Sequence, residues 1–298
     1  MTIGAQAPQP PGGTALLAGK PVARVGFGAM QLPGPRVSGP PRDRNTALAV
    51  LHRAVELGVN HIDTAEFYGP HVANELIRAA LHPYPPELVL VTKVGAQRDD
   101  QGGWVPAQRP EQLRSGVEEN LRSLGVDQLH VVNLRLHDGD GNAVDLDSQL
   151  AEMVALRDEG KIGGIGISNV ALGQLRQALP VGIACVQNAY SLLDRSAESI
   201  FDLCRQHEIA WVPYFPLGSA FPHIPKVTDH PTVVAAAIGL GATPAQVGLA
   251  WLLAHGPGVL LIPGTSSVQH LEENVGSGRV LLGSATIAAL DGLAETAS

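Results

Sequence analysis

Residues 88–94 read Leu88-Val-Leu-Val-Thr-Lys-Val94, an apolar run with one lysine near its end. A continuously apolar run of this length is typical of a strand that is covered on both faces, as in a parallel sheet. Working outward, short β-rich runs alternate with helical stretches from residues 22–30 to residues 259–262. Alternating β and α units predict a parallel sheet. About eight such units can be counted, which favours closure into a single-domain α/β fold, the (β/α)8 TIM barrel.

The barrel is expected to occupy residues 21–298, because a barrel of this type usually fills about 250 residues. Residues 1–20 contain the run PQPPGG and are predicted to form a flexible N-terminal arm. A doubly wound open sheet is the structural alternative. It is disfavoured because no G-x-G-x-x-G motif follows the first strand, where the sequence reads Val25-Gly-Phe-Gly-Ala-Met30.

Composition excludes several function classes. The chain has 298 residues, and 20 Lys+Arg against 28 Asp+Glu give a formal net charge of −8. An acidic chain without a Lys/Arg run is not expected to take nucleic acid or an anionic membrane as its main partner. Two cysteines, Cys185 and Cys204, cannot build a disulfide framework or a zinc cluster, so no metal site is expected. Neither a signal peptide nor an apolar run of about 18 residues is found, and a cytoplasmic location is the simplest expectation.

Three polar residues lie at or after the ends of predicted strands. Asp63 ends the second strand, Tyr68 follows in the next loop, and Lys93 ends the third strand. Strand alternation places Lys93 on the face of Val89 and Val91, and a buried ammonium there needs an anion, for which Asp63 is the candidate. A nearby ammonium lowers the pKa of a tyrosine from about 10, which would make Tyr68 a better proton donor to a forming alkoxide. The alternative is a structural Asp–Lys bridge beside a surface tyrosine.

Eight short motifs occur in an order that resembles the aldo-keto reductases, from residue 22 to the C-terminus. They are Gly26-Phe-Gly-Ala-Met30, Asn60-x-x-Asp63-Thr-Ala-x-x-Tyr68-Gly69, Val91-Thr-Lys93, Leu124-Gly-Val-Asp127, Gly166-Ile-Ser-Asn169, Val186-Gln-Asn188, Tyr214-x-Pro-Leu-Gly218 and Ile262-Pro-Gly-Thr265 with Glu273-Asn274. No single motif is decisive, but all of them in order are specific. The resemblance implies a (β/α)8 barrel, a nicotinamide cofactor (NADPH, with NADH as the alternative) and reversible reduction of a small-molecule carbonyl substrate.

The resemblance also implies a role for each matching residue. Tyr68 matches the general acid/base, and Lys93 and Asp63 match the pair that tunes it. The residues that match cofactor contacts are Gly28, Ala29, Met30 and Asp63; Ser168, Asn169 and Gln187 at the carboxamide; Tyr214 stacked on the ring; Pro216, Leu217, Gly218 and Ser219 near the pyrophosphate; and Thr265, Ser266, Ser267, His270, Glu273 and Asn274 at the adenosine end. The alternatives are ordinary turn residues for the polar groups and buried packing for Tyr214.

Two positions depart from the family pattern. Where the family has a catalytic histidine at the end of the fourth strand, this chain has Arg135, with His137 two residues on. An arginine cannot relay a proton, but it can stabilise negative charge on a substrate oxygen. His137 is expected to line the substrate site or to be merely a loop residue. At the cofactor tail, Gly264-Thr265 and His270 stand where many members have a basic pair. A histidine is only partly charged near neutral pH, so a less absolute preference for NADP is expected.

Four segments, among them Val131-Val-Asn-Leu-Arg135 and Phe67-Tyr-Gly-Pro-His71, are similar to a bacterial subgroup of pyridoxal reductases. This similarity implies reduction of pyridoxal to pyridoxine. Trp104 is then a candidate wall for a flat aromatic ring, with loop packing as its alternative. A general reductase of sugar or natural-product carbonyls, and a regulatory barrel that binds NADPH with little catalysis, remain alternatives. A monomer or weak homo-oligomer is expected.

Overall fold

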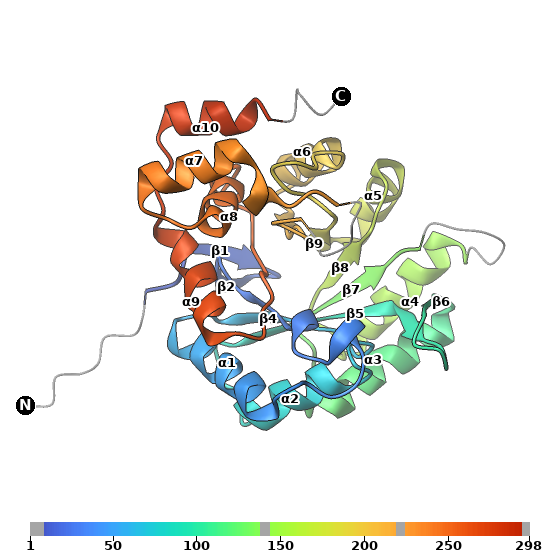
Figure 1. Cartoon of the computed structure of the whole chain (residues 1–298). Coiled ribbons are helices and arrows are strands. Elements are labelled where there is room, and N and C mark those ends of the chain that lie inside the picture. Colours follow the sequence, from blue (N-terminus) through green and yellow to red (C-terminus); the bar gives the residue numbers. More distant parts are fainter. Residues whose placement is uncertain (1–8, 138–143, 219–223, 294–298) are drawn as a thin grey trace, which may run out of the picture.

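The computed structural model describes residues 9–137, 144–218 and 224–293 (Figure 1). Its main sheet is built from parallel strands in sequence order: β3 (Phe27–Gly28), β4 (His61–Asp63), β5 (Val89–Arg98), β7 (Val131–Arg135), β8 (Ile165–Ser168), β9 (Ile183–Gln187) and β10 (Ala210–Trp211). Parallel bridges join Trp211 to Val259 and Val25 to Leu261. Residues 259–261 therefore stand in the eighth strand position between β10 and the first strand. The expected (β/α)8 barrel is confirmed.

Helices surround the sheet in Figure 1. They are α1 (Arg44–Glu56), α2 (Val72–Leu81), α3 (Pro110–Leu124), α4 (Leu146–Asp158), α5 (Leu172–Ala178), α6 (Glu198–Gln206), α7 (Pro231–Leu240), α8 (Pro244–Ala254), α9 (Val268–Gly276) and α10 (Ser284–Asp291). Local signals set several of their starts: the Asp43 carboxylate accepts from the Asn45 amide at α1, and the Thr243 hydroxyl accepts from the Gln246 amide at α8. None of the described helices is long and apolar enough to cross a bilayer by itself, although α7 and α8 together reach that length across a 92° bend.

The N-terminal segment corrects one expectation. Residues 1–8 lie outside the described part, but β1 (Thr14–Leu17) and β2 (Lys20–Ala23) form an antiparallel hairpin. Its turn residues, Ala18 and Gly19, both have positive φ, as a type I′ hairpin turn requires. Leu17 is 1% exposed and packs inside the barrel. The boundary of a flexible arm at residue 20 is therefore wrong, because the hairpin buries apolar side chains in the base of the barrel.

The barrel interior has an apolar lower part and a polar upper part. The lower part contains Leu17, Val22, Val89, Val91, Val131, Cys185, Ala210, Val212, Leu260 and Ile262. His61 also lies there, and burial lowers its pKa to about 4, so the imidazole is neutral at pH 7. A Cβ at Gly26 would lie 2.2 Å from the His61 ring, which explains the glycine. Polar side chains begin one pleat higher, at the carboxyl ends of the strands, where barrel enzymes carry their chemistry.

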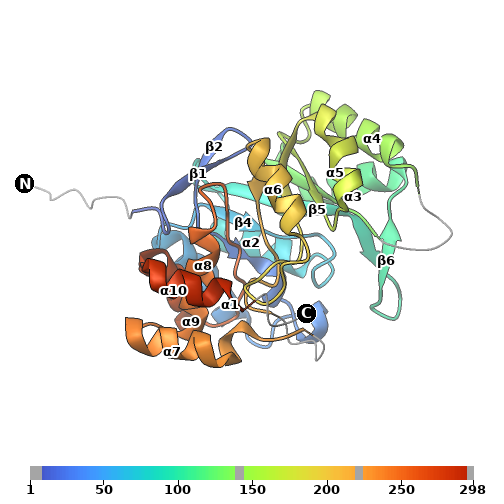
Figure 2. The ribbon, with the colours of Figure 1, turned by 90° about the horizontal axis from the view of Figure 1, so that it is seen from above.

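The segment after Lys93 also differs from expectation. Trp104 does not lie in an irregular loop, because β5 continues beyond the barrel and pairs antiparallel with β6 (Trp104–Ala107). Figure 2 shows this hairpin projecting from the body of the molecule. Arg98 and Trp104 are partners in its register. The hairpin therefore gives Trp104 a fixed position relative to the barrel.

Candidate active site

Asp63, Lys93 and Tyr68 meet at the carboxyl end of the barrel. The Lys93 ammonium donates to the Asp63 carboxylate and, at 3.0 Å, to the Thr64 carbonyl oxygen. Its Nζ lies 5.1 Å from the centroid of the Tyr68 ring. All three side chains are buried, with Tyr68 6% exposed. The carboxylate, the ammonium and the phenol that the sequence pattern brings together therefore lie close to one another.

Burial decides the ionisation of Tyr68. The pKa of Tyr68 is raised above its ordinary value, because burial disfavours the phenolate by more than the Lys93 and Arg135 charges favour it. The expectation that Lys93 makes the Tyr68 pKa lower than usual is therefore wrong for the ligand-free protein. For Lys93, burial opposes the charge, but Asp63 and Tyr68 outweigh it and raise the pKa of the ammonium. At pH 7 the site holds a protonated phenol beside a charged ammonium.

A buried polar network outside the barrel fixes the residues next to Asp63 and Lys93. The Thr64 hydroxyl donates to Asn74 Oδ1 of α2 at 2.8 Å, and the Thr92 hydroxyl donates to Asn120 Oδ1 of α3 at 2.6 Å. The Asn74 amide then donates to Asn120 Oδ1 at 2.9 Å. Successive strand residues point to opposite faces, so Thr64 and Thr92 face outward while their neighbours Asp63 and Lys93 face into the barrel. The outer network therefore fixes the positions of Asp63 and Lys93 along the barrel axis. No motif in the sequence predicted this network.

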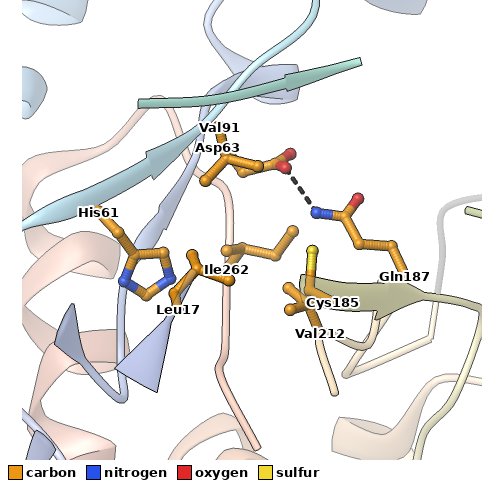
Figure 3. A pocket seen from close by; sticks show the side chains of 8 residues that line it. All are labelled: Leu17, His61, Asp63, Val91, Cys185, Gln187, Val212 and Ile262. Carbon is orange, nitrogen blue, oxygen red and sulfur yellow. Dashed lines mark hydrogen bonds between the residues drawn. The ribbon is translucent and has the colours of Figure 1, made fainter. Parts of the chain in front are cut away.

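Gln187 joins the Asp63–Lys93 pair from the opposite side of the barrel. Its Nε2 donates to the second Asp63 oxygen at 2.7 Å (Figure 3), while no described residue hydrogen-bonds its buried Oε1. Ser168 ends β8, where it is 2% exposed, and Asn169 follows it with a positive φ of 59°. The Asn169 amide donates to the Leu136 carbonyl at 3.1 Å. Ser168, Asn169 and Gln187 therefore lie at neighbouring strand ends.

Tyr214 lies beside this group. Its hydroxyl donates to Asn169 Oδ1 at 3.3 Å, and its ring meets Phe215 edge-on. The turn between β8 and the following helix is held by Asn188, which the sequence analysis did not single out as a site residue. Asn188 Oδ1 accepts from the Val170 amide at 3.0 Å, and its Nδ2 donates to the Val170 carbonyl at 2.8 Å. This clamp positions Asn169.

The residues expected at a cofactor tail lie around the start of α9. The Thr265 hydroxyl accepts from the Ser267 amide at 3.0 Å, and the Ser267 hydroxyl accepts from the His270 amide at 3.4 Å. Ser266 and His270 are exposed, and Asn274 is buried. The Glu273 carbonyl accepts from Gln246 Nε2 at 3.0 Å.

On the first strand, a Cβ at Gly28 would lie 2.4 Å from the Ile262 carbonyl, so no larger residue fits there. Ala29 and Met30 begin the short 3-10 turn η1 (Ala29–Gln31). Pro216 and Gly218 form a bridge around Leu217, and Ser219 lies outside the described residues.

Trp104 and Arg98 form one edge of the site. The Trp104 ring lies 5.2 Å from the Phe67 ring and 6.3 Å from the Tyr68 ring, centroid to centroid. The Arg98 guanidinium lies 3.6 Å from the Trp104 centroid. Arg98 also donates to the carbonyl oxygens of Phe67 (3.3 Å), Gly102 (2.7 Å), Arg36 (3.3 Å) and Val37 (2.9 Å). Arg98 was not predicted as a site residue, although an arginine at the end of an apolar strand is a signal for one.

Arg135 ends β7 on the face that points into the barrel, one pleat beyond Asn133. Its carbonyl oxygen accepts from Gln108 Nε2 at 3.1 Å. Its charge lies close enough to Tyr68 to lower the pKa of the phenol in part. His137 is half-buried two residues further on, next to the undescribed residues 138–143. Across the described residues, no three His, Cys, Asp or Glu side chains converge as a metal site would require.

Comparison with known proteins places this arrangement in a family. A model described as the aldo/keto reductase family matches residues 24–295. The chain is 46% identical over 286 residues to the pyridoxine 4-dehydrogenase of Escherichia coli (strain K12), covering 95% of this chain and 98% of that protein. It is 36% identical over 284 residues to an uncharacterised oxidoreductase of Schizosaccharomyces pombe, covering 94% of this chain and 89% of that one.

Solved structures agree with this family. A thermostable aldo-keto reductase in complex with the inhibitor epalrestat has a TM-score of 0.80 at 27% identity, covering 94% of this chain and 99% of that chain. An aldo/keto reductase from Klebsiella pneumoniae in complex with NADP and acetate has a TM-score of 0.75 at 28% identity, covering 92% of each chain. The family model and the relatives span nearly the whole barrel, and the chain belongs to the aldo/keto reductase family of oxidoreductases.

Proposed function

We propose that this protein reduces an aldehyde to an alcohol with NADPH, that pyridoxal is its substrate, and that Tyr68 donates the proton. The observation that carries the proposal is the buried contact of Lys93 with Asp63 beside the protonated Tyr68 phenol. The name of the relative that is 46% identical, pyridoxine 4-dehydrogenase, supports pyridoxal and pyridoxine as the substrate pair.

The residues at the barrel mouth fit a nicotinamide nucleotide. Gln187 Oε1 is a buried acceptor without a partner among the described residues, and it would accept from a carboxamide N–H. Asn169 and Tyr214 lie beside it, and the hydroxyls at the start of α9 suit phosphate oxygens. Two Klebsiella pneumoniae relatives were solved with NADP and with NADPH. When bound, the reduced nicotinamide supplies the hydride, and with it both electrons of the reduction.

The side chains of this protein supply the proton and the charge balance. As the carbonyl carbon is reduced, the Oη–H bond of Tyr68 breaks and the proton joins the carbonyl oxygen, giving the alcohol. The Lys93 ammonium stabilises the tyrosinate that remains, and Asp63 keeps Lys93 charged. In the oxidative direction the tyrosinate takes the alcohol proton back.

The test is direct. Purified protein is mixed with NADPH and pyridoxal, NADPH loss is followed by absorbance, and the product is identified by chromatography. Pyridoxine formed in a one-to-one ratio with NADPH consumed supports the proposal. If sugar aldehydes are reduced faster than pyridoxal, the proposed reductase chemistry stands, but pyridoxal is no longer the proposed substrate. No turnover of any aldehyde would favour a regulatory barrel.

The pH dependence of the reaction follows from the raised pKa of Tyr68. Because burial raises this pKa above the ordinary value of about 10, the phenol keeps its proton throughout the neutral range. We expect kcat/KM for aldehyde reduction to stay level from neutral pH upward and to fall only above about pH 10. Oxidation of the alcohol, which needs the tyrosinate, should rise over the same alkaline range. A kcat/KM for aldehyde reduction that declines near pH 7 would contradict Tyr68 as the proton donor.

Cofactor preference can be measured at His270. This exposed residue stands where a basic pair would hold a 2′-phosphate. We expect NADPH to bind more tightly than NADH in the wild type. His270→Ala should weaken NADPH binding by about tenfold or more, since one hydrogen bond to a charged group is lost, and leave NADH binding unchanged. Titration of both cofactors by fluorescence gives the dissociation constants. Equal constants in the wild type would contradict an NADPH enzyme.

Arg98 is predicted to act on substrate binding through Trp104. Arg98→Met removes the hydrogen bonds that tie Val37 and Phe67 to the β5–β6 hairpin, and the bond to Gly102 within the hairpin turn. We expect KM for pyridoxal to rise by about tenfold with a smaller change in kcat, because the ring wall is displaced while Tyr68 and Lys93 remain. Iodide quenching should also reach Trp104 more easily. Arg109→Gln, at an exposed arginine paired with Glu111, is the control. Unchanged KM and unchanged quenching would exclude this role.

A further inference from the structure

Arg135 is a half-buried cation whose guanidinium lacks an acceptor in the described structure. Outside the β7–β8 ladder, the residue takes part in one hydrogen bond among the described residues, in which its backbone carbonyl accepts from Gln108 Nε2. Arg98, at the same end of the barrel, donates to four carbonyl oxygens. A partly buried charge without a partner is costly, so the Arg135 site is incomplete without an acceptor from a ligand.

Position and shape restrict that acceptor. Arg135 lies on the inward face of β7, two residues beyond Asn133, whose register partner is Lys93. Lys93 Nζ lies 5.1 Å from the centroid of the Tyr68 ring, and Arg135 is one pleat above the register partner of Lys93, so a carbonyl oxygen held by Tyr68 lies on the side of the barrel from which the guanidinium projects. The Trp104 ring, whose centroid lies 6.3 Å from that of Tyr68, offers a flat apolar surface next to the phenol. A planar guanidinium presents parallel N–H groups that match two neighbouring oxygens, which a lysine or a histidine cannot do.

We propose that Arg135 selects aromatic aldehydes that carry an ionised hydroxyl on the ring carbon next to the carbonyl group. One edge of the guanidinium then binds both the carbonyl oxygen and the phenolate oxygen. This inference rests on the proposed aldehyde reduction and narrows its substrate class. It also explains an arginine at this strand end, because a neutral imidazole would leave the phenolate without a counter-charge.

The experiment compares four aldehydes with NADPH as the reductant: benzaldehyde, 2-hydroxybenzaldehyde, 2-methoxybenzaldehyde and 4-hydroxybenzaldehyde. The methoxy compound keeps the ortho oxygen but cannot ionise. The 4-hydroxy compound ionises at the wrong position and controls for the electronic effect of a phenolate. We expect kcat/KM for 2-hydroxybenzaldehyde to exceed that for 2-methoxybenzaldehyde by about tenfold or more, and this ratio to grow as pH rises through the ionisation of the hydroxyl.

Substitutions of Arg135 test whether this residue causes the preference for the ortho-hydroxy aldehyde. In Arg135→Gln, which removes the charge, the ratio between the two ortho compounds should fall toward one, whatever the remaining rate. In Arg135→Lys, which keeps the charge but not the paired N–H groups, the ratio should fall in part, while Arg109→Gln should keep the wild-type ratio. A wild-type ratio near one overturns the inference even if no Arg135 variant folds. A ratio that survives both Arg135 substitutions also overturns it. Turnover of all four aldehydes without ortho preference leaves the proposed function standing, whereas no turnover with these aldehydes or with pyridoxal defeats both.

Discussion

Tyr68→Phe is expected to lower kcat for pyridoxal reduction by about 10²–10⁴-fold, the range that general acid catalysis usually contributes. The substitution removes only the hydroxyl, and the ring keeps its edge-on contacts with Phe67 and Trp104. NADPH binding and the circular dichroism spectrum should therefore be nearly unchanged. Rapid-mixing measurements of the chemical step separate this loss from slow product release.

Tyr84→Phe is the matched control. The Tyr84 hydroxyl donates to the Leu124 carbonyl at 2.7 Å, and it is a partly buried phenol that forms none of the candidate-site contacts. We expect this variant to keep the wild-type kcat with a modest loss of stability. If Tyr68→Phe also kept the wild-type kcat, a group other than this phenol would have to donate the proton.

Lys93→Met is expected to abolish measurable turnover and also to lower the free energy of unfolding by about 3–5 kcal/mol, the usual cost of breaking a buried ion pair. Among the described residues, the substitution leaves Gln187 Nε2 as the side-chain donor to the buried Asp63 carboxylate. It also removes the cation that stabilises the tyrosinate. Urea unfolding at pH 7 measures the first effect, and NADPH oxidation measures the second.

A second substitution separates the two effects. In Asp63→Asn/Lys93→Met the unpaired charge is gone, so stability should recover in large part while activity stays absent. Lys161→Met, at a lysine that pairs with Glu118 near the surface, is the control and should affect both quantities little. Recovery of activity in the double variant would show that the ammonium is structural and has no part in proton transfer.

The sequence predicts the barrel because its signals are local and repeated. Continuously apolar runs such as residues 88–91 alternate with helical stretches. The strand period of about two residues and the helix period of about 3.6 residues are enough to interpret them. The hairpin of residues 14–23 was missed because its strands are short and its turn, Ala18-Gly19, lacks the usual Asn-Gly or Asp-Gly signal. What orders it is the burial of Leu17 inside a barrel whose strands come later in the chain.

The candidate site also combines features that follow from local sequence signals with features that depend on packing between distant segments. The Asp63–Lys93 contact is predictable, since strand alternation and neighbouring strand ends suffice. The raised pKa of Tyr68 is not, because its sign depends on how much packing surrounds the phenol. The meeting of Asn74 and Asn120 also depends on how α2 packs against α3. Arg98 likewise gains its role only when β5 folds back through β6 and brings Trp104 beside it.

The most direct measurement of the central claim is a single-turnover reaction in a stopped-flow instrument, with wild-type protein and bound NADPH mixed with pyridoxal, beside the same reaction with Tyr68→Phe. The account predicts rapid oxidation of the bound NADPH in the wild type, one pyridoxine formed for each cofactor consumed, and a slowing of this phase by at least about 10²-fold in the variant. Equal rates in the two proteins, or no oxidation of NADPH in the wild type, would contradict it.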